Sequence, residues 1–114
     1  MKLSKTLLVI LFISLLSSPS WSETIDDLVI REGTYYLKFS DVPFTGEVTG
    51  QYQGSFKNGK REGAWTVYYS DGQLFKKGNY KNGKQDGAWV IHNESGQRMP
   101  QFSGIFKNGI KISD

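Results

Sequence analysis

The sequence of 114 residues contains no cysteine and a single histidine, His92. The absence of cysteine excludes disulfides, thiolate metal ligands, thiol nucleophiles and a lipid-modified cysteine. A single histidine also leaves too few bases for a Ser–His–Asp or similar catalytic set. His92 stands where an earlier copy of the internal repeat described below has Tyr68, so we expect a packing role for it. These shortages predict a chain that is not an enzyme, with no catalytic residue, cofactor or metal site.

Long hydrophobic runs are also scarce, and the main one, Leu7–Ile13, lies near the N-terminus. It is much shorter than the ~20 apolar residues that a membrane-spanning helix needs. Two lysines precede it, and the small residues Ser20 and Ser22 follow it, which is the pattern of a secretory signal. We therefore predict a signal peptide over residues 1–22, cleaved after Ser22, and a periplasmic or secreted protein.

Charge of one sign does not dominate the chain. Loss of Lys2 and Lys5 with the signal would lower the formal net charge from +3 to +1. Several lysines flank Asn-Gly pairs, but acidic residues are interspersed among them; these lysines are Lys57, Lys60, Lys81, Lys84 and Lys107. Nucleic-acid binding depends on many phosphate contacts from a basic surface. The sequence therefore predicts no nucleic-acid partner.

What the chain does contain is an internal repeat rich in aromatic residues. Gly54–Lys60 recurs 24 positions later as Gly78–Lys84, and a third copy begins at Gly104. The same offset places Trp65 on Trp89. A fixed period of this size is typical of stacked supersecondary units. Aromatic residues make up 14% of the chain, and their burial can stabilise a small β-protein that has no disulfides.

Each repeat is predicted to be a β-hairpin. Asn-Gly favours a two-residue turn because both central residues adopt positive φ. By the period-two rule, Trp65, Val67 and Tyr69 share one face of their strand, while Ala64, Thr66 and Tyr68 share the other. Pro100 predicts that the third return strand is an edge, bulged or interrupted. We therefore expect an all-β fold, an elongated open meander of repeated antiparallel hairpins.

The repeated glycines need a physical reason, because glycine weakens a strand. We expect them to leave room for neighbouring rings, with the tryptophan of one repeat covering the gap in the next. The residues predicted to hold the repeat together are Gly54, Phe56, Asn58, Gly59, Gly63, Trp65, Gly72, Gly78, Tyr80, Asn82, Gly83, Gly87, Trp89, Gly96, Gly104, Phe106, Asn108 and Gly109.

The organisation of the chain after the signal follows from the repeat. Residues 23–53 are less regular, with expected strands at Leu28–Arg31, Thr34–Phe39 and Phe44–Val48. Terminal units of a repeat array are usually atypical, so this segment is predicted to be a degenerate capping repeat. The repeats are expected to occupy residues 54–77, 78–103 and, partially, 104–114.

The pattern Gly-x-Phe/Tyr-Lys-Asn-Gly-Lys-x-x-Gly-x-Trp-x-x-Tyr/His-x-x-x-Gly-Gln spans 54–73 and 78–97 and begins again at 104–109. It resembles the MORN-repeat variant of bacterial YwqK-type antitoxins, and Asp41–Gly46 looks like the lead-in often seen before such repeats. The resemblance implies hairpins laid side by side into an open sheet that serves as a scaffold, self-associates, or binds proteins or lipid head groups. The antitoxin label implies neutralisation of a partner toxin by binding.

The aromatic stripe of the repeats has two interpretations. Its rings could form the core of a thin sheet, or one aromatic face could stay exposed as a docking patch, since exposed apolar patches usually mark partners. The residues that we expect to contact a partner are Tyr68, Tyr69, Lys76 and Lys77.

Our leading interpretation is an exported, non-catalytic module of the cell envelope that binds a protein or serves as a scaffold, through a sheet face or an open edge strand. One alternative is an antitoxin or immunity protein. Another is a module that binds anionic lipid at a membrane surface through the turn lysines. Edge strands also permit a homo-oligomer.

Overall fold

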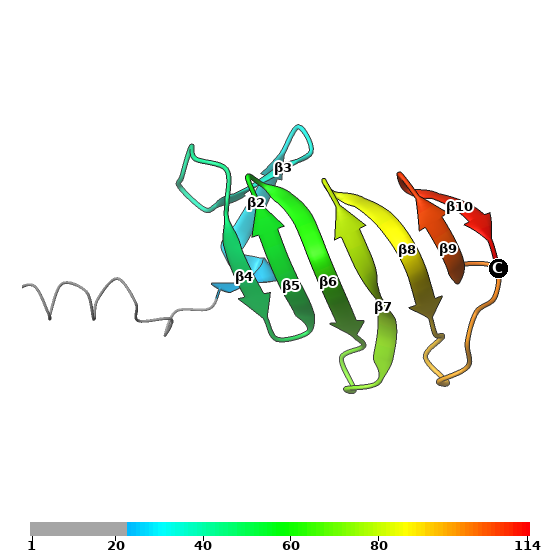
Figure 1. The fold of residues 1–114 in the computed structure, drawn as a ribbon. Helices are drawn as coiled ribbons and strands as arrows, with labels where there is room; N and C mark the ends of the chain where they lie inside the picture. Colours follow the sequence, from blue (N-terminus) through cyan, green and yellow to red (C-terminus); the bar gives the residue numbers. More distant parts are fainter. Residues whose placement is uncertain (1–22) are drawn as a thin grey trace, which may run out of the picture.

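The computed structural model describes residues 23–114, so the predicted signal peptide at 1–22 lies outside the described residues. The chain is all-β, with an open sheet of eight strands and a separate sheet of two strands (Figure 1). No helix within residues 23–114 is long and apolar enough to cross a bilayer. In chain order, the elements are β1 (Glu23–Thr24), the 3₁₀ helix η1 (Ile25–Asp27), β2 (Leu28–Arg31), β3 (Thr34–Leu37), β4 (Gly46–Thr49), β5 (Tyr52–Lys57), β6 (Lys60–Tyr68), β7 (Leu74–Lys81), β8 (Lys84–Ile91), β9 (Gly104–Lys107) and β10 (Ile110–Ser113).

The large sheet follows the chain. Strands β4 to β10 pair antiparallel with their neighbours in sequence order, and β1 pairs parallel with β4 at one end. Strand β10 forms the other edge, and the sheet does not close (Figure 1). The predicted all-β fold, an open antiparallel meander, is confirmed.

The Asn-Gly pairs form the turns that their sequence predicts. Asn58 has a φ of 50° and Gly59 a φ of 79°, and both later Asn-Gly pairs repeat these values within a few degrees. These turns join β5 to β6, β7 to β8 and β9 to β10 along one long edge of the sheet, at the top in Figure 1. Each later turn also donates a backbone hydrogen bond to the preceding hairpin, from Gly83 N to Arg61 O and from Gly109 N to Gln85 O, both at 2.9 Å.

The core is a row of aromatic rings that crosses the strands on one face. The ring centroids are 5.1 Å apart between Phe56 and Trp65, 5.9 Å between Trp65 and Tyr80, and 4.9 Å between Tyr80 and Trp89, all with edge-to-face geometry. All four side chains are buried, and Phe106 packs against the row half-buried. Each ring covers the next, so one sheet layer buries its own core.

Gly54 and Gly78 make room for these rings. A Cβ atom at Gly54 would lie 2.3 Å from the ring of Trp65, and one at Gly78 would lie 2.2 Å from the ring of Trp89. Each tryptophan therefore covers the glycine of its own repeat, and the expectation that it covers the next repeat is wrong. The reason lies in a hydrogen bond: Trp65 Nε1 donates to Ser55 O at 3.0 Å, which directs the ring back over β5.

The connection from β8 to β9 is irregular, as Pro100 predicts. It contains no strand, only an isolated bridge between His92 and Arg98. Ser103, fully buried, replaces the missing pairing: its Oγ accepts a hydrogen bond from Ile91 N at 2.9 Å and lies 3.3 Å from Ile91 O. A side chain thus satisfies backbone groups that a strand would otherwise satisfy.

The segment before the repeats forms the small sheet of β2 and β3 together with β1 and β4. The hairpin of β2 and β3 packs on the first Asn-Gly turn, where Tyr35 N donates to Gly59 O at 2.9 Å, and the Tyr35 ring lies 4.8 Å from that of Phe56. The strand expected to reach Phe39 ends at Leu37, because Phe39 has a φ of 66°, outside the extended region. Whether this segment is a degenerate repeat stays a prediction.

Candidate functional site

The structure separates the two lysines predicted to contact a partner. In β7, Lys76 pairs with Val67 of β6 and so lies on the face of the aromatic row, whereas Lys77 pairs with Thr66 and points to the opposite face. Lys76 is half-buried and Lys77 is exposed. One partner surface on a sheet face can therefore include only one of them.

Tyr69 and Lys76 meet at a third residue, Phe75, which sequence reasoning missed. The ring centroids of Tyr69 and Phe75 are 4.7 Å apart, and Lys76 Nζ lies 5.5 Å from the Phe75 centroid. We call these three residues the Tyr69 cluster. Phe75 follows the Ser-Asp-Gly turn at the start of β7, and its counterpart one repeat later is Met99. An aromatic residue beside two lysines is the signal that could have identified it.

Tyr69 is held in place from both sides. Its hydroxyl donates a hydrogen bond to His92 O at 2.7 Å, which ties the end of β6 to the end of β8. Its backbone N donates to Gln73 O at 2.8 Å across the turn. Desolvation raises the pKa of the Tyr69 phenol, and the nearby carboxylates of Glu94 and Asp71 raise it further. The phenol is therefore a neutral hydrogen-bonding group over the physiological pH range.

Beside the Tyr69 cluster the surface is hollowed. The hollow has a volume of about 410 Å³ and lies between the β4–β5 and β6–β7 turns, lined by Gly50, Gln51, Tyr68, Tyr69, Ser70 and Gly72. Tyr68 N donates to Gln51 O at 2.9 Å, which fixes the two turns relative to each other. Two tyrosines and exposed turn backbone offer both apolar area and hydrogen-bonding groups, a combination enriched at protein interfaces.

Lys76 carries its charge in a poorly solvated position. Burial lowers the pKa of its ammonium, and the nearby guanidinium of Arg61 lowers it further. Arg61 itself stacks over Tyr80, with its Cζ 4.3 Å from the ring centroid, and its Nη1 donates to the Tyr80 hydroxyl at 3.1 Å. The aromatic face thus holds two cations close to the rings, where an acidic group of a partner would be attracted.

The lysines of the Asn-Gly turns gather on one long edge of the sheet, since all three turns lie there (Figure 1). Lys57, Lys81, Lys84 and Lys107 are exposed. Lys60 is half-buried, because its Nζ donates to Gly33 O at 2.7 Å. The opposite edge carries Asp71 and Glu94 in its turns. Acids are nevertheless interspersed with these lysines: at the lysine edge Glu62 Oε1 accepts a hydrogen bond from Asn82 N at 2.9 Å.

Groups suited to catalysis do not converge. Within residues 23–114 no three His, Asp or Glu side chains lie together in a way that could hold a metal ion. His92 Nδ1 is buried without a hydrogen-bond partner among the described residues, and no carboxylate orients that ring. The rings of the aromatic stripe are buried or half-buried in the core, and the half-buried Tyr68 and Tyr69 line the hollow.

Comparisons with protein-family models, curated proteins and solved structures found no match to this chain.

Proposed function

We propose that the chain is an exported, non-catalytic repeat module, built like MORN-type hairpin arrays, that binds a partner protein in the cell envelope. The export signal, the open sheet and the shortage of catalytic residue types support this proposal.

The observation that carries the proposal is the hollow beside the Tyr69 cluster. Tyr68 and Tyr69 line it, and the hydrogen bond to His92 O fixes Tyr69, so little side-chain entropy is lost when a partner binds. Lys76, a member of the cluster, holds its charge in a poorly solvated position. The partner chemistry that fits is an extended segment with an apolar or aromatic side chain for the hollow and a single acidic group for Lys76, because Asp71 and Glu94 near Tyr69 would repel further acids.

A matched pair of variants tests the proposal. Envelope extract is passed over immobilised wild-type protein, over Tyr68→Ser and over Lys77→Ser, with bound proteins identified by mass spectrometry. We expect one species to be retained by the wild type and by Lys77→Ser, because Lys77 neither lines the hollow nor belongs to the Tyr69 cluster. Tyr68→Ser should retain at least ~10-fold less of it. Recovery of no reproducible species, or equal recovery by all three proteins, would contradict the proposal.

A second candidate function is binding to an anionic membrane surface, favoured by the lysines gathered on one edge. Each lysine near such a surface contributes about 1 kcal/mol, so four exposed lysines could hold the chain there at low salt. Vesicle flotation with increasing anionic lipid content tests this function, with Lys81→Glu/Lys84→Glu as the variant. Binding that does not depend on lipid charge would exclude it.

The antitoxin alternative rests on the family resemblance alone. It predicts that the protein suppresses a toxin encoded beside it. Co-expression with the product of each adjacent gene tests the prediction, and rescue of growth from a toxic neighbour is the expected result.

A further inference from the structure

The loop between β3 and β4 holds an aromatic ring in solvent on a strained backbone. Phe39 has a φ of 66°, a left-handed conformation that bulky residues rarely adopt, and its side chain is fully exposed, with a relative accessibility of 105%. Neither feature contributes to folding, since the backbone conformation costs energy and the ring contacts no core. Such strain persists only where the surrounding structure imposes it, and it is concentrated at functional positions.

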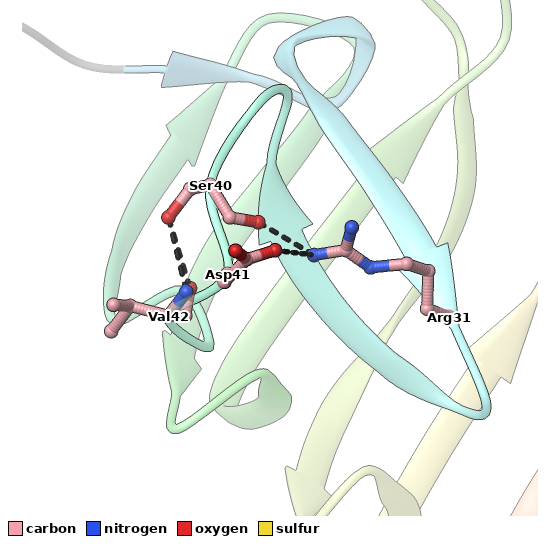
Figure 2. A network of polar contacts seen from close by, with 4 residues as sticks. All are labelled: Arg31, Ser40, Asp41 and Val42. Carbon is pink, nitrogen blue, oxygen red and sulfur yellow. Dashed lines mark hydrogen bonds and ion pairs between the residues drawn. The ribbon is translucent and has the colours of Figure 1, made fainter.

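Polar contacts hold the loop after Phe39, and those among Arg31, Ser40, Asp41 and Val42 are shown in Figure 2. Arg31 Nη2 donates to Ser40 O at 2.5 Å and lies 3.8 Å from Asp41 Oδ1, while the guanidinium stacks on the ring of Tyr36 at 4.0 Å. Ser40 Oγ in turn accepts a hydrogen bond from Val42 N at 3.1 Å. On the other side of Phe39, Lys38 N donates to Asp27 O at 3.0 Å. Residues on both sides of Phe39 are therefore fixed, and the ring is presented at a defined place.

The same loop also borders a surface hollow of mixed lining, with Leu37, Val42, Pro43 and Phe44 as its apolar part. The hollow has a volume of about 370 Å³ and is lined by Leu37, Ser40, Val42, Pro43, Phe44, Thr45 and Asn58. An apolar cavity of about 150 Å³ is enough to bind benzene. Val42, on its rim, is 71% exposed. One surface therefore carries a protruding ring and, next to it, a space large enough to receive such a ring.

We propose that this loop is a self-association site, at which two copies of the chain exchange their Phe39 rings about a twofold axis. A twofold contact needs one self-complementary surface, and a ring beside a matching hollow is such a surface. The exposed charges of the loop are one base and one acid, Lys38 and Asp41. Two copies can therefore approach without net repulsion.

Self-association explains the rigidity of the loop better than a lipid occupant does. A bilayer has no fixed pocket, so fixing the ring beforehand does not strengthen binding to it. Binding to a protein pocket is strengthened, because a preorganised ring loses less conformational entropy. The apolar area of one phenylalanine ring and one valine is also too small for stable membrane binding, since even a single myristoyl chain gives only marginal membrane binding. The proposal is independent of the partner site at Tyr69, which lies at the other long edge of the sheet.

Sedimentation velocity over a ~100-fold concentration range tests the proposal on the wild type, on Phe39→Asn and on Phe102→Asn. Asparagine tolerates positive φ, so Phe39→Asn removes the ring and relieves the strain. We expect a wild-type dimer that Phe39→Asn weakens by at least ~10-fold while its melting temperature holds or rises. Phe102→Asn, the same change at a Phe that is 53% exposed near the other end of the array, should leave the dimer intact.

A charge on the rim of the hollow provides the reciprocal test. Val42→Glu should also abolish the homodimer, yet mixed with Phe39→Asn it should form a heterodimer, because its own ring can still enter the intact hollow of the other copy. A wild type that stays monomeric throughout the range would overturn the proposal. So would a dimer that survives Phe39→Asn, one that Phe102→Asn disrupts equally, or a mixture that shows no heterodimer.

Discussion

At the residue scale, the fold depends on glycines that are required for space. Gly54 leaves no gap for a methyl group, because a Cβ there would lie 2.3 Å from two ring atoms of Trp65. The ring cannot move aside easily, since it is buried and donates a hydrogen bond to Ser55 O. A single added carbon must therefore displace the core.

We predict that Gly54→Ala lowers the free energy of unfolding by about 1–3 kcal/mol, the usual cost of overpacking. The double variant Gly54→Ala/Trp65→Leu should lose less free energy of unfolding than the sum of the two single changes. The smaller leucine side chain leaves room for the added Cβ atom. Urea unfolding of the four proteins measures the coupling. Additive costs would mean that the ring is not what excludes a side chain at this position.

A second prediction concerns Lys76, whose pKa burial lowers. Between the lowered folded value and the ordinary value of the unfolded chain, the unfolded state binds more protons. The free energy of unfolding therefore rises with pH through that window. Below the window Lys76 is charged in both states, so the desolvation of its charge lowers stability by the full amount. Lys76→Met should stabilise the protein by up to about 1 kcal/mol at pH 7, and this gain should shrink toward alkaline pH.

Denaturant unfolding from neutral to alkaline pH tests this prediction, with Lys77→Met as the control. Lys77 is exposed on the opposite face, so its replacement should change stability by no more than about 0.5 kcal/mol at pH 7. A gain for Lys76→Met that is constant with pH would show that its origin is packing rather than charge.

At the element scale, the hairpins follow from short-range sequence. Asn-Gly specifies its turn through positive φ at Asn58 and Gly59, and alternation specifies which side chains face the core. The sequence also predicts the strands β2 and β3, but the docking of their hairpin on the first Asn-Gly turn could not be predicted this way. That docking depends on contacts between segments far apart in sequence, such as Tyr35 with Gly59, for which local patterns contain no signal.

The three Asn-Gly turns are alike in sequence but not in surroundings, which gives a third prediction. A Cβ at Gly59 would lie 2.3 Å from Thr34 Cγ2, while one at Gly109 would lie 3.7 Å from its nearest neighbour, Lys84 Cβ. Gly109→Ala should cost about 1–2 kcal/mol for the left-handed backbone alone. Gly59→Ala should cost more, because the β2–β3 hairpin must also shift. Thermal unfolding measures the order, and equal costs would mean that the hairpin does not hold the turn tightly.

At the scale of the whole molecule, the aromatic row makes the chain a one-dimensional array. Trp65 lies between Phe56 and Tyr80, and Tyr80 between Trp65 and Trp89, so each of these two rings is packed from both sides. Phe106 is only half-buried, and Ile110 in β10 is 69% exposed. In such an array each unit is stabilised by its neighbours alone, and the final unit has a neighbour on one side only.

The last prediction follows from this difference in packing between the middle of the aromatic row and its end. Amides of β6 and β7 should exchange most slowly with deuterium, because opening them disrupts two neighbours, whereas amides of β10 should exchange fastest by fraying at the open edge. The expected difference is at least ~10-fold in protection, measured by mass spectrometry. Trp89→Leu should speed exchange in β8 to β10 more than in β4 and β5, because the ring lies toward that end of the row. Uniform protection from β4 to β10 would show a single cooperative unit in place of an array stabilised by neighbours.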